Sequence, residues 1–194
     1  AGTLQGAILI LRSSQFPQAR RTVSGLGILL GLQVILFIIS GMALRGLIDP
    51  KIVLPPLDRA VTLLALIWIA WLWVFPEPLR LSDSSTLLLN LIVLGLFGVT
   101  LALWSQKPGI SFNASVFEKI WQVFSMAVII LGTFGLLRRR PNGWGNGLAM
   151  LLLAFIGHLL SLFWSMGGNF PGFVRLTQLA LFPILLTILQ RFPA

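Results

Sequence analysis

The chain has 194 residues, of which 57% are hydrophobic and only 10% are charged, and its mean hydropathy is +0.95. A soluble domain carries roughly 25% charged residues, so this composition excludes an ordinary soluble domain and predicts an integral membrane protein. The formal net charge is +9, but the basic residues fall in short gaps between apolar runs and form no basic stripe. This argues against nucleic-acid binding and indicates residues that set topology and contact lipid headgroups.

The apolar runs predict helices, because none shows the alternation of a membrane β-strand. Six runs approach the roughly 20 residues that span a bilayer: 23–44, 58–76, 86–104, 119–137, 147–166 and 175–190. Residues 1–11 add a shorter run, which we interpret as a seventh helix cut at its start or as a half-inserted segment. We therefore predict an all-α, polytopic membrane helix bundle over residues 1–194, with six full transmembrane helices and a seventh at the N-terminus.

The second predicted helix is preceded by the sequence "LPPLDRA", in which two prolines stand before Asp58 and Arg59. Prolines suit a loop that enters a first helical turn, and a carboxylate in that turn complements the positive helix end. We expect Arg59 to reach lipid headgroups or Asp49. On this interpretation the pair is a surface anchor at the outer face, and a role at the lip of an outward-facing ligand pocket is the alternative.

The start of the fourth predicted helix carries a sharper signal. Ser115 and Glu118 have the spacing of a capping box, in which each side chain satisfies a free amide of the first turn. The spacing predicts a helix that begins about one turn before residue 119.

The basic residues in alternate gaps predict the orientation in the membrane. One side receives Arg12, Arg20, Arg21, Arg80, Arg138, Arg139, Arg140 and Arg191, and the other receives Arg45, Lys51, Arg59, Lys107, Lys119 and Arg175. The dense clusters fall in the first set, which predicts that this side and the C-terminus are cytoplasmic.

Ionisable residues deep in a membrane usually mark proton relays or substrate sites. We expect almost none at that depth in this sequence. All five acids lie in gaps or within about a turn of a predicted helix end, which argues against a proton-coupled transporter. The three lysines lie at helix edges, which argues against a retinal Schiff base. The chain contains no Cys, which excludes disulfides and thiolate metal sites, and it contains no recognisable catalytic motif.

His158, the only histidine, lies near the middle of its predicted helix. It is either a buried histidine bonded to a neighbouring helix, for example to Ser161 or Gln178, or an axial ligand of haem or a chlorophyll-type pigment. We favour the first interpretation and predict no metal site. Trp68 and Trp71 share a helical face and either pack against other helices or form the aromatic wall of a ligand pocket.

Several other residues carry expectations about helix packing. Gly27 and Gly31 have GxxxG spacing, which permits close approach of two helices. Most tryptophans near helix ends suggest an aromatic belt at the membrane interface. Gln178 is one of several intramembrane polar residues expected to hydrogen-bond across helices or to line a pocket. Pro183 removes one backbone hydrogen bond and predicts a kink in the last helix.

Two stretches carry a resemblance to a known family. "LPPLDRAVTLLALIWIAWLW" and "FVRLTQLALFPILLTIL" resemble helices of the membrane-embedded sensor regions of bacterial, Chloroflexota-type, multi-domain histidine kinases, and "GHLLSLFW" fits the penultimate helix. In that family about seven helices precede cytoplasmic signalling modules and a kinase. The resemblance implies an N-out, C-in bundle, and any kinase activity would lie outside this chain.

The sequence thus favours a non-catalytic sensor-like module in a bacterial cytoplasmic membrane, with lipids and cytoplasmic signalling domains as partners and homo-oligomerisation possible. Its ligand or membrane state would bias the last helix by a population shift. The alternative is a small accessory subunit of a respiratory or photosynthetic complex, which would hold lipid or pigment through its apolar faces and His158.

Overall fold

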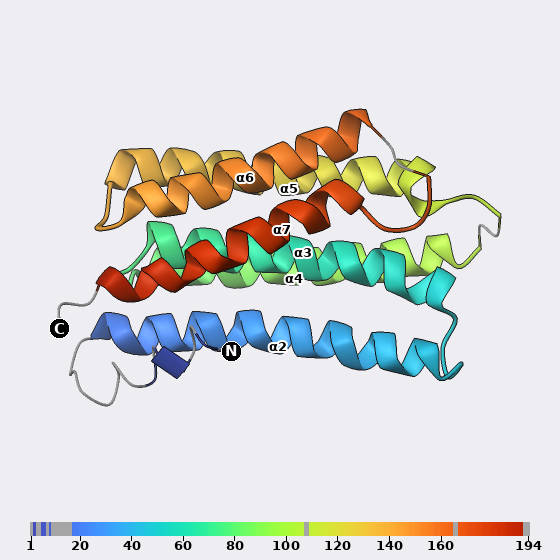
Figure 1. Ribbon diagram of the computed structural model, residues 1–194, viewed down its shortest axis with the longest axis horizontal. Helices are drawn as coiled ribbons and strands as arrows, with labels where there is room; N and C mark the ends of the chain where they lie inside the picture. The colour runs from blue at the N-terminus through green and yellow to red at the C-terminus, as the bar shows by residue number, and fades with distance from the viewer. Residues whose placement is uncertain are drawn as a thin grey trace.

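The computed structural model describes residues 2, 5, 6, 8, 17–106, 109–164 and 167–191. These form a bundle of helices that run alternately up and down (Figure 1). They are α2 (Pro17–Leu44), α3 (Pro50–Val74), α4 (Arg80–Trp104), α5 (Val116–Arg139), α6 (Trp144–Phe163) and α7 (Gly172–Ile184), with 3₁₀ segments at Phe112–Ala114 and Leu185–Arg191.

The prediction of an all-α bundle with six spanning helices is confirmed. Six helices are long and apolar enough to cross a membrane, and no strand occurs among the described residues. The expected seventh helix over residues 1–11 lies largely outside the described part of the chain. Pro183 falls where α7 gives way to the 3₁₀ segment, at the position of the expected break in the last helix.

The helices define two ends of the bundle (Figure 1). The arginine-rich end carries Arg20, Arg21, Arg80, Arg138, Arg139 and Arg140, and the opposite end is formed by the described loop residues 45–49, 105–106, 109–115, 164 and 167–171. This arrangement follows from the alternation of the helices and matches the two sets of gaps in the sequence. Arg59, which we assigned to the opposite set, lies inside the bundle and is 3% exposed.

The central helix is α3, which contacts α2, α4, α5 and α6. From Pro55 to Val74 every residue except Trp68 and Ala70 is buried, whereas α4 buries only five of its 25 residues. The outer helices therefore turn most of their surface outward, and that surface is apolar, as a lipid-facing surface should be. A polar side chain between Pro55 and Val74 of α3 is consequently enclosed by protein.

The start of α3 differs from the predicted helix 58–76. The helix begins at Pro50, and Asp49 caps it by accepting a hydrogen bond from the amide of Lys51. Pro55 and Pro56 lie inside the helix. A proline lacks the amide that would bond the carbonyl four residues earlier, and for Pro55 that carbonyl belongs to Lys51. It accepts a hydrogen bond from the indole of Trp104 at 2.9 Å instead.

Glycines set the closest helix contacts, but they are not the two we expected. Among the described residues, a Cβ added to Gly27 or Gly31 would meet nothing within 4 Å, so the predicted close helix contact at these two glycines does not occur there. The close approaches occur elsewhere. A Cβ at Gly147 would lie 2.8 Å from the ring of Trp73, and a Cβ at Gly157 would overlap the hydroxyl of Thr177.

The predicted aromatic belt is only partly correct. Trp164 is 66% exposed, but Trp73 of α3 is 0% and Trp121 of α5 is 1% exposed, because both pack in the hydrophobic core. These two rings therefore stabilise the bundle interior.

Candidate functional site: a buried ionic network on the central helix

Asp58 and Arg59 lie inside the bundle, and the surface-anchor interpretation is therefore wrong. Asp58 is the ninth residue of α3, well past the first turn, and the two residues are 4% and 3% exposed. The error follows from the helix start, since α3 begins eight residues earlier than we predicted. Arg59 contacts neither solvent nor Asp49.

Arg59 is the centre of the cluster. Its Nε donates to Glu118 at 2.7 Å, and its Nη1 donates to the backbone carbonyl of Asn169 at 2.8 Å. Its Nη2 donates to the side-chain carbonyl of Asn113, and Nη1 also faces Asp58 at 3.4 Å. The nitrogen donors of the guanidinium thus all face acceptors on α3, α5 and two loops. This arrangement ties the loops of the opposite end to the central helix.

The two loops are also bonded directly to each other. Asn169 accepts a hydrogen bond from the amide of Phe112, and Asn113 donates to the carbonyl of Phe170. The ring of Phe112 is 0% exposed and lies 4.9 Å below the Arg59 guanidinium. The loops therefore close the end of the bundle above Arg59 and shield its ion pairs from water.

The cluster continues from Glu118 into the bundle. Glu118 accepts a hydrogen bond from Gln122 one turn further along α5, and Gln122 bonds to Nδ1 of His158 on α6 at 2.5 Å. The Gln122 amide also reaches Ser161 at 3.4 Å. All four side chains are buried. His158 therefore contacts a neighbouring helix, as the favoured interpretation held, but its partner is Gln122.

On the other side the cluster reaches α7. Arg175 donates to Asp58 at 2.9 Å, and its side chain is 47% exposed. One turn below, Gln178 donates to Thr62 of α3 at 3.1 Å. We call Asp58, Arg59, Asn113, Glu118, Gln122, His158, Ser161 and Arg175 the Arg59 network. It contains two carboxylates and two guanidiniums, so its formal charges balance within the bundle.

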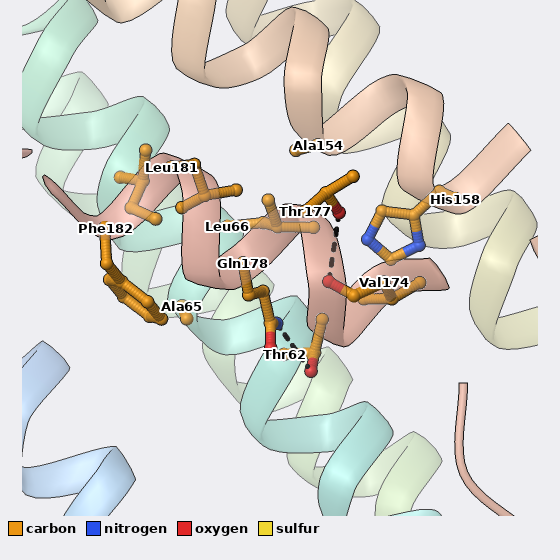
Figure 2. A pocket seen from close by; sticks show the side chains of 11 residues that line it. Thr62, Ala65, Leu66, Ala154, His158, Val174, Thr177, Gln178, Leu181 and Phe182 are labelled. Carbon is orange, nitrogen blue, oxygen red and sulfur yellow. Dashed lines mark hydrogen bonds between the residues drawn. The ribbon is translucent and has the colours of Figure 1, made fainter. Parts of the chain in front are cut away.

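A small cavity adjoins the network between α3, α6 and α7 (Figure 2). His158 and Thr177 lie at one side of it, and Leu181 and Phe182 lie at the other. Its volume is about 10 Å³, which is room for a single water. A haem or chlorophyll macrocycle does not fit in this cavity beside His158. Among the described residues, no three His, Asp or Glu side chains gather as metal ligands do.

Trp68 and Trp71 belong to a different cluster. Trp71 lies thirteen residues beyond Asp58 on α3, which is about 20 Å at 1.5 Å per residue. Its indole donates to Asp83 at 2.9 Å, and the guanidinium of Arg21 stacks 3.8 Å above its ring. Trp68 packs edge-on against Trp71 and donates to Asn90 of α4. The six residues predicted to line a ligand pocket therefore form two groups. Asp58, Arg59, His158 and Gln178 lie in or beside the Arg59 network, and Trp68 and Trp71 lie toward the C-terminal end of α3.

Arg21 and Asp83 hold this second cluster together. Arg21 forms two hydrogen bonds with the Asp83 carboxylate and a third, at 2.8 Å, with the carbonyl of Phe75 at the end of α3. We call Arg21, Trp71, Ser82 and Asp83 the Trp71 cluster. It joins α2, α3 and α4 at the arginine-rich end.

Sequence reasoning missed Asn113, Glu118 and Gln122 as members of a site. Glu118 was assigned to a capping box, and half of that prediction is confirmed, since Ser115 caps α5 by accepting from the amide of Glu118. The Glu118 side chain, however, bonds to Arg59 and Gln122. Glu118, Gln122 and Ser125 recur at spacings of four and three, which puts polar groups on one face of a helix. These polar residues on one face of the helix were the sequence signal that could have identified the site.

Comparison with known protein families, with curated proteins and with solved structures found no match to this chain. The site is therefore interpreted from its own geometry.

Proposed function

We propose that this chain is a non-catalytic, receptor-like membrane module of a signal-transduction protein, in which α7 transmits a ligand or membrane state to the cytoplasm. The observation that carries the proposal is the ion pair between Arg175 of α7 and the buried carboxylate of Asp58. It joins the last helix to a set of charges inside the bundle. Ionisable groups enclosed in membrane helices are costly and usually mark functional sites.

The proposed mechanism needs an α7 contact that breaks more easily than the rest of the network. The Arg175–Asp58 and Arg59–Glu118 ion pairs differ in this way. Arg59 and Glu118 are both buried, and removing one partner of a buried pair costs about 3–5 kcal/mol. Arg175 is 47% exposed, so water can replace part of its contact with Asp58, and Asp58 still has Arg59 at 3.4 Å when that contact breaks. Breaking the Arg175–Asp58 contact of α7 therefore costs less free energy than breaking the Arg59–Glu118 pair. A polar or anionic ligand that reaches the exposed side of Arg175 would compete with Asp58 directly.

The direction of transmission is supported by the course of α7. Figure 1 shows α7 crossing the bundle obliquely from the opposite end toward the C-terminus. Its α-helical part ends at Ile184, directly after Pro183, and a 3₁₀ segment continues to Arg191. A change in the Arg175 contact would therefore be carried along one helix to the arginine-rich end.

The resemblance of "LPPLDRAVTLLALIWIAWLW" and "FVRLTQLALFPILLTIL" to sensor regions of multi-domain histidine kinases supports the same proposal. On that basis the proposed location is a bacterial cytoplasmic membrane with the C-terminus in the cytoplasm. The proposed partners are cytoplasmic domains of a two-component system, and the surrounding lipids.

A distance measurement tests whether the network governs α7. The chain contains no Cys, so paired spin labels can be attached to Leu186→Cys and Leu137→Cys, at positions that are 50% and 42% exposed near the arginine-rich end. In lipid nanodiscs we expect Asp58→Asn to shift or broaden the distance distribution between these labels. A control pair on Leu81 and Leu137, which joins α4 to α5, should not change.

The matched control variant is Lys119→Gln, because Lys119 is exposed and adjoins Glu118 in the sequence. It should leave both distance distributions as in the parent. If Asp58→Asn leaves the distance from Leu186 to Leu137 unchanged, the network does not govern the last helix, and the proposed route of transmission is rejected.

A further inference from the structure

A groove of about 600 Å³ runs between α4 and α5, with α3 as its floor. Its floor extends from Ile67 to Phe75, which is about 12 Å at 1.5 Å per residue. The hydrocarbon core of a bilayer is about 30 Å thick, so one leaflet contributes about 15 Å. The groove thus has nearly the depth of one leaflet and lies in the half of the bundle at the arginine-rich end. Its volume is in the usual range of small-molecule sites.

The floor of the groove is closed and its side is open. Gly132 and Gly135 bring α5 close to α3. A Cβ added to Gly132 would lie 3.1 Å from Ala70, and one added to Gly135 would lie 3.0 Å from Val74. The rims carry apolar side chains that point outward, such as Leu81 at 82% and Leu131 at 68% exposed. A ligand can therefore enter sideways from the lipid phase, and no opening through the protein is needed.

Polar groups gather at one end of the groove only. Ser82, Ser85 and Thr86 line it from the first turns of α4, and Arg139 lines it from the last turn of α5. The remaining lining toward the bundle centre is apolar apart from backbone. This order, with polar groups at the membrane surface and apolar groups inside, matches a molecule with a polar head and a hydrocarbon tail.

The polar end is positively charged. The Arg139 guanidinium lies 4.6 Å from the centre of the Phe75 ring, which holds it at the mouth of the groove. The nearby carboxylate of Asp83 is already paired with Arg21 at 2.5 Å. Arg138 adjoins Arg139 and is also exposed. An arginine fork binds phosphate oxygens well, and anionic lipid headgroups are attracted by such clusters.

We propose that this groove binds one anionic phospholipid of the leaflet at the arginine-rich end, independently of the receptor-like function proposed above. One acyl chain lies on the α3 floor between α4 and α5. The headgroup phosphate pairs with Arg139 and accepts a hydrogen bond from the hydroxyl of Ser85, which is exposed in the first turns of α4.

Native mass spectrometry of the full chain released from nanodiscs tests the proposal. The nanodiscs contain equal amounts of dioleoylphosphatidylglycerol and dioleoylphosphatidylcholine. We expect one retained lipid per chain, with the anionic lipid preferred about fivefold, the change expected from one arginine at an anionic surface. Arg139→Gln should remove most of this preference. Arg138→Gln, which changes the neighbouring exposed arginine outside the groove lining, should retain it.

A second pair of variants tests the place of the acyl chain. Ala127 lines the groove, so Ala127→Trp fills it and should abolish the retained lipid of either kind. Ile130→Trp puts the same bulk on the same helix at a position that is 53% exposed and outside the groove lining, and it should leave retention unchanged.

Four outcomes would overturn the proposal. They are equal retention of the two lipids by the parent, equal effects of Arg138→Gln and Arg139→Gln, a retained lipid in Ala127→Trp, and a dimer of the parent that Ala127→Trp dissociates. The last outcome would assign the groove to a second copy of the chain. Because Ala127→Trp and Arg139→Gln alter different parts of the groove, the failure of one variant to fold leaves the other as a test.

Discussion

The burial of Arg59 leads to a large and specific prediction about stability. Replacing it with Met removes the hydrogen bonds to Glu118, Asn113 and the carbonyl of Asn169. Glu118 is then left at 3% exposure without the guanidinium. Removing one partner of a buried ion pair costs about 3–5 kcal/mol, because the group that remains is buried without an opposite charge. We expect Arg59→Met to lower the free energy of unfolding by that amount.

A double-mutant cycle separates the pair from its surroundings. Glu118→Met alone leaves Arg59 with Asp58 at 3.4 Å as its remaining carboxylate, so this variant should also be strongly destabilised. The double variant Arg59→Met/Glu118→Met removes both charges and leaves no uncompensated ion at that pair. Its cost should fall below the sum of the single costs by about 0.5–3 kcal/mol, the range found for residues in direct contact.

The assay is reversible unfolding in mixed micelles of sodium dodecyl sulfate and dodecylmaltoside, followed by far-ultraviolet circular dichroism. Arg45→Met is the matched control, since Arg45 is exposed in a loop at the same end, and it should change the free energy of unfolding by less than about 0.5 kcal/mol. If Arg59→Met behaves like Arg45→Met, Arg59 is a surface anchor and the buried network does not exist. Additive single costs would mean that Arg59 and Glu118 are not paired.

The remaining predictions concern helix contacts, the histidine and the last helix. In the same unfolding assay Gly157→Ala should cost about 1–3 kcal/mol because its Cβ overlaps α7, whereas Gly31→Ala meets open space and should be neutral or stabilising by up to about 1 kcal/mol; equal effects would contradict this assignment. His158→Leu leaves the buried Gln122 carbonyl oxygen without its ring partner and should cost about 1–3 kcal/mol. The visible absorption of the purified protein should be the same before and after that change, and a pigment band lost with His158 would refute the packing role. Pro183→Ala restores an amide at the end of α7, so in a receptor that contains this module we expect signalling output to change more than stability; unchanged output of a reporter gene would count against a transmitting role.

The helices themselves were predictable because each depends on a long, continuous signal. A run of about 20 apolar residues has few alternatives in a membrane protein, and the Ser115 cap predicted the start of α5 to within about a turn. The start of α3 was not predictable in the same way. Two prolines inside a helix normally argue for a boundary, and here the Lys51 carbonyl, which Pro55 leaves without its usual amide, is satisfied by Trp104 of α4. A contact between residues 53 positions apart leaves no trace in the local sequence.

The error at α3 then determined the error at the site. With the helix start at Asp58, the carboxylate falls in a solvated first turn; with the start at Pro50, it falls inside the bundle. Glu118 was similar, because its spacing from Ser115 satisfies a local rule and conceals its contact with Arg59. The glycine prediction failed for a related reason. GxxxG spacing identifies a smooth helix face, but which glycine a partner approaches depends on the packing of the whole bundle.

The arrangement of ion pairs along α3 restricts where movement can occur in this bundle. At the arginine-rich end Arg21 fixes the end of α3 through Asp83 and the carbonyl of Phe75, and at the opposite end Arg59 fixes it to α5 and the closing loops. The central helix is thus held at both ends by arginines that are themselves largely enclosed. The charged contact of α7 is a single pair with a half-exposed arginine, so its loss costs least. If the module switches between two packings, α3 should serve as the fixed reference and α7 as the element that moves against it.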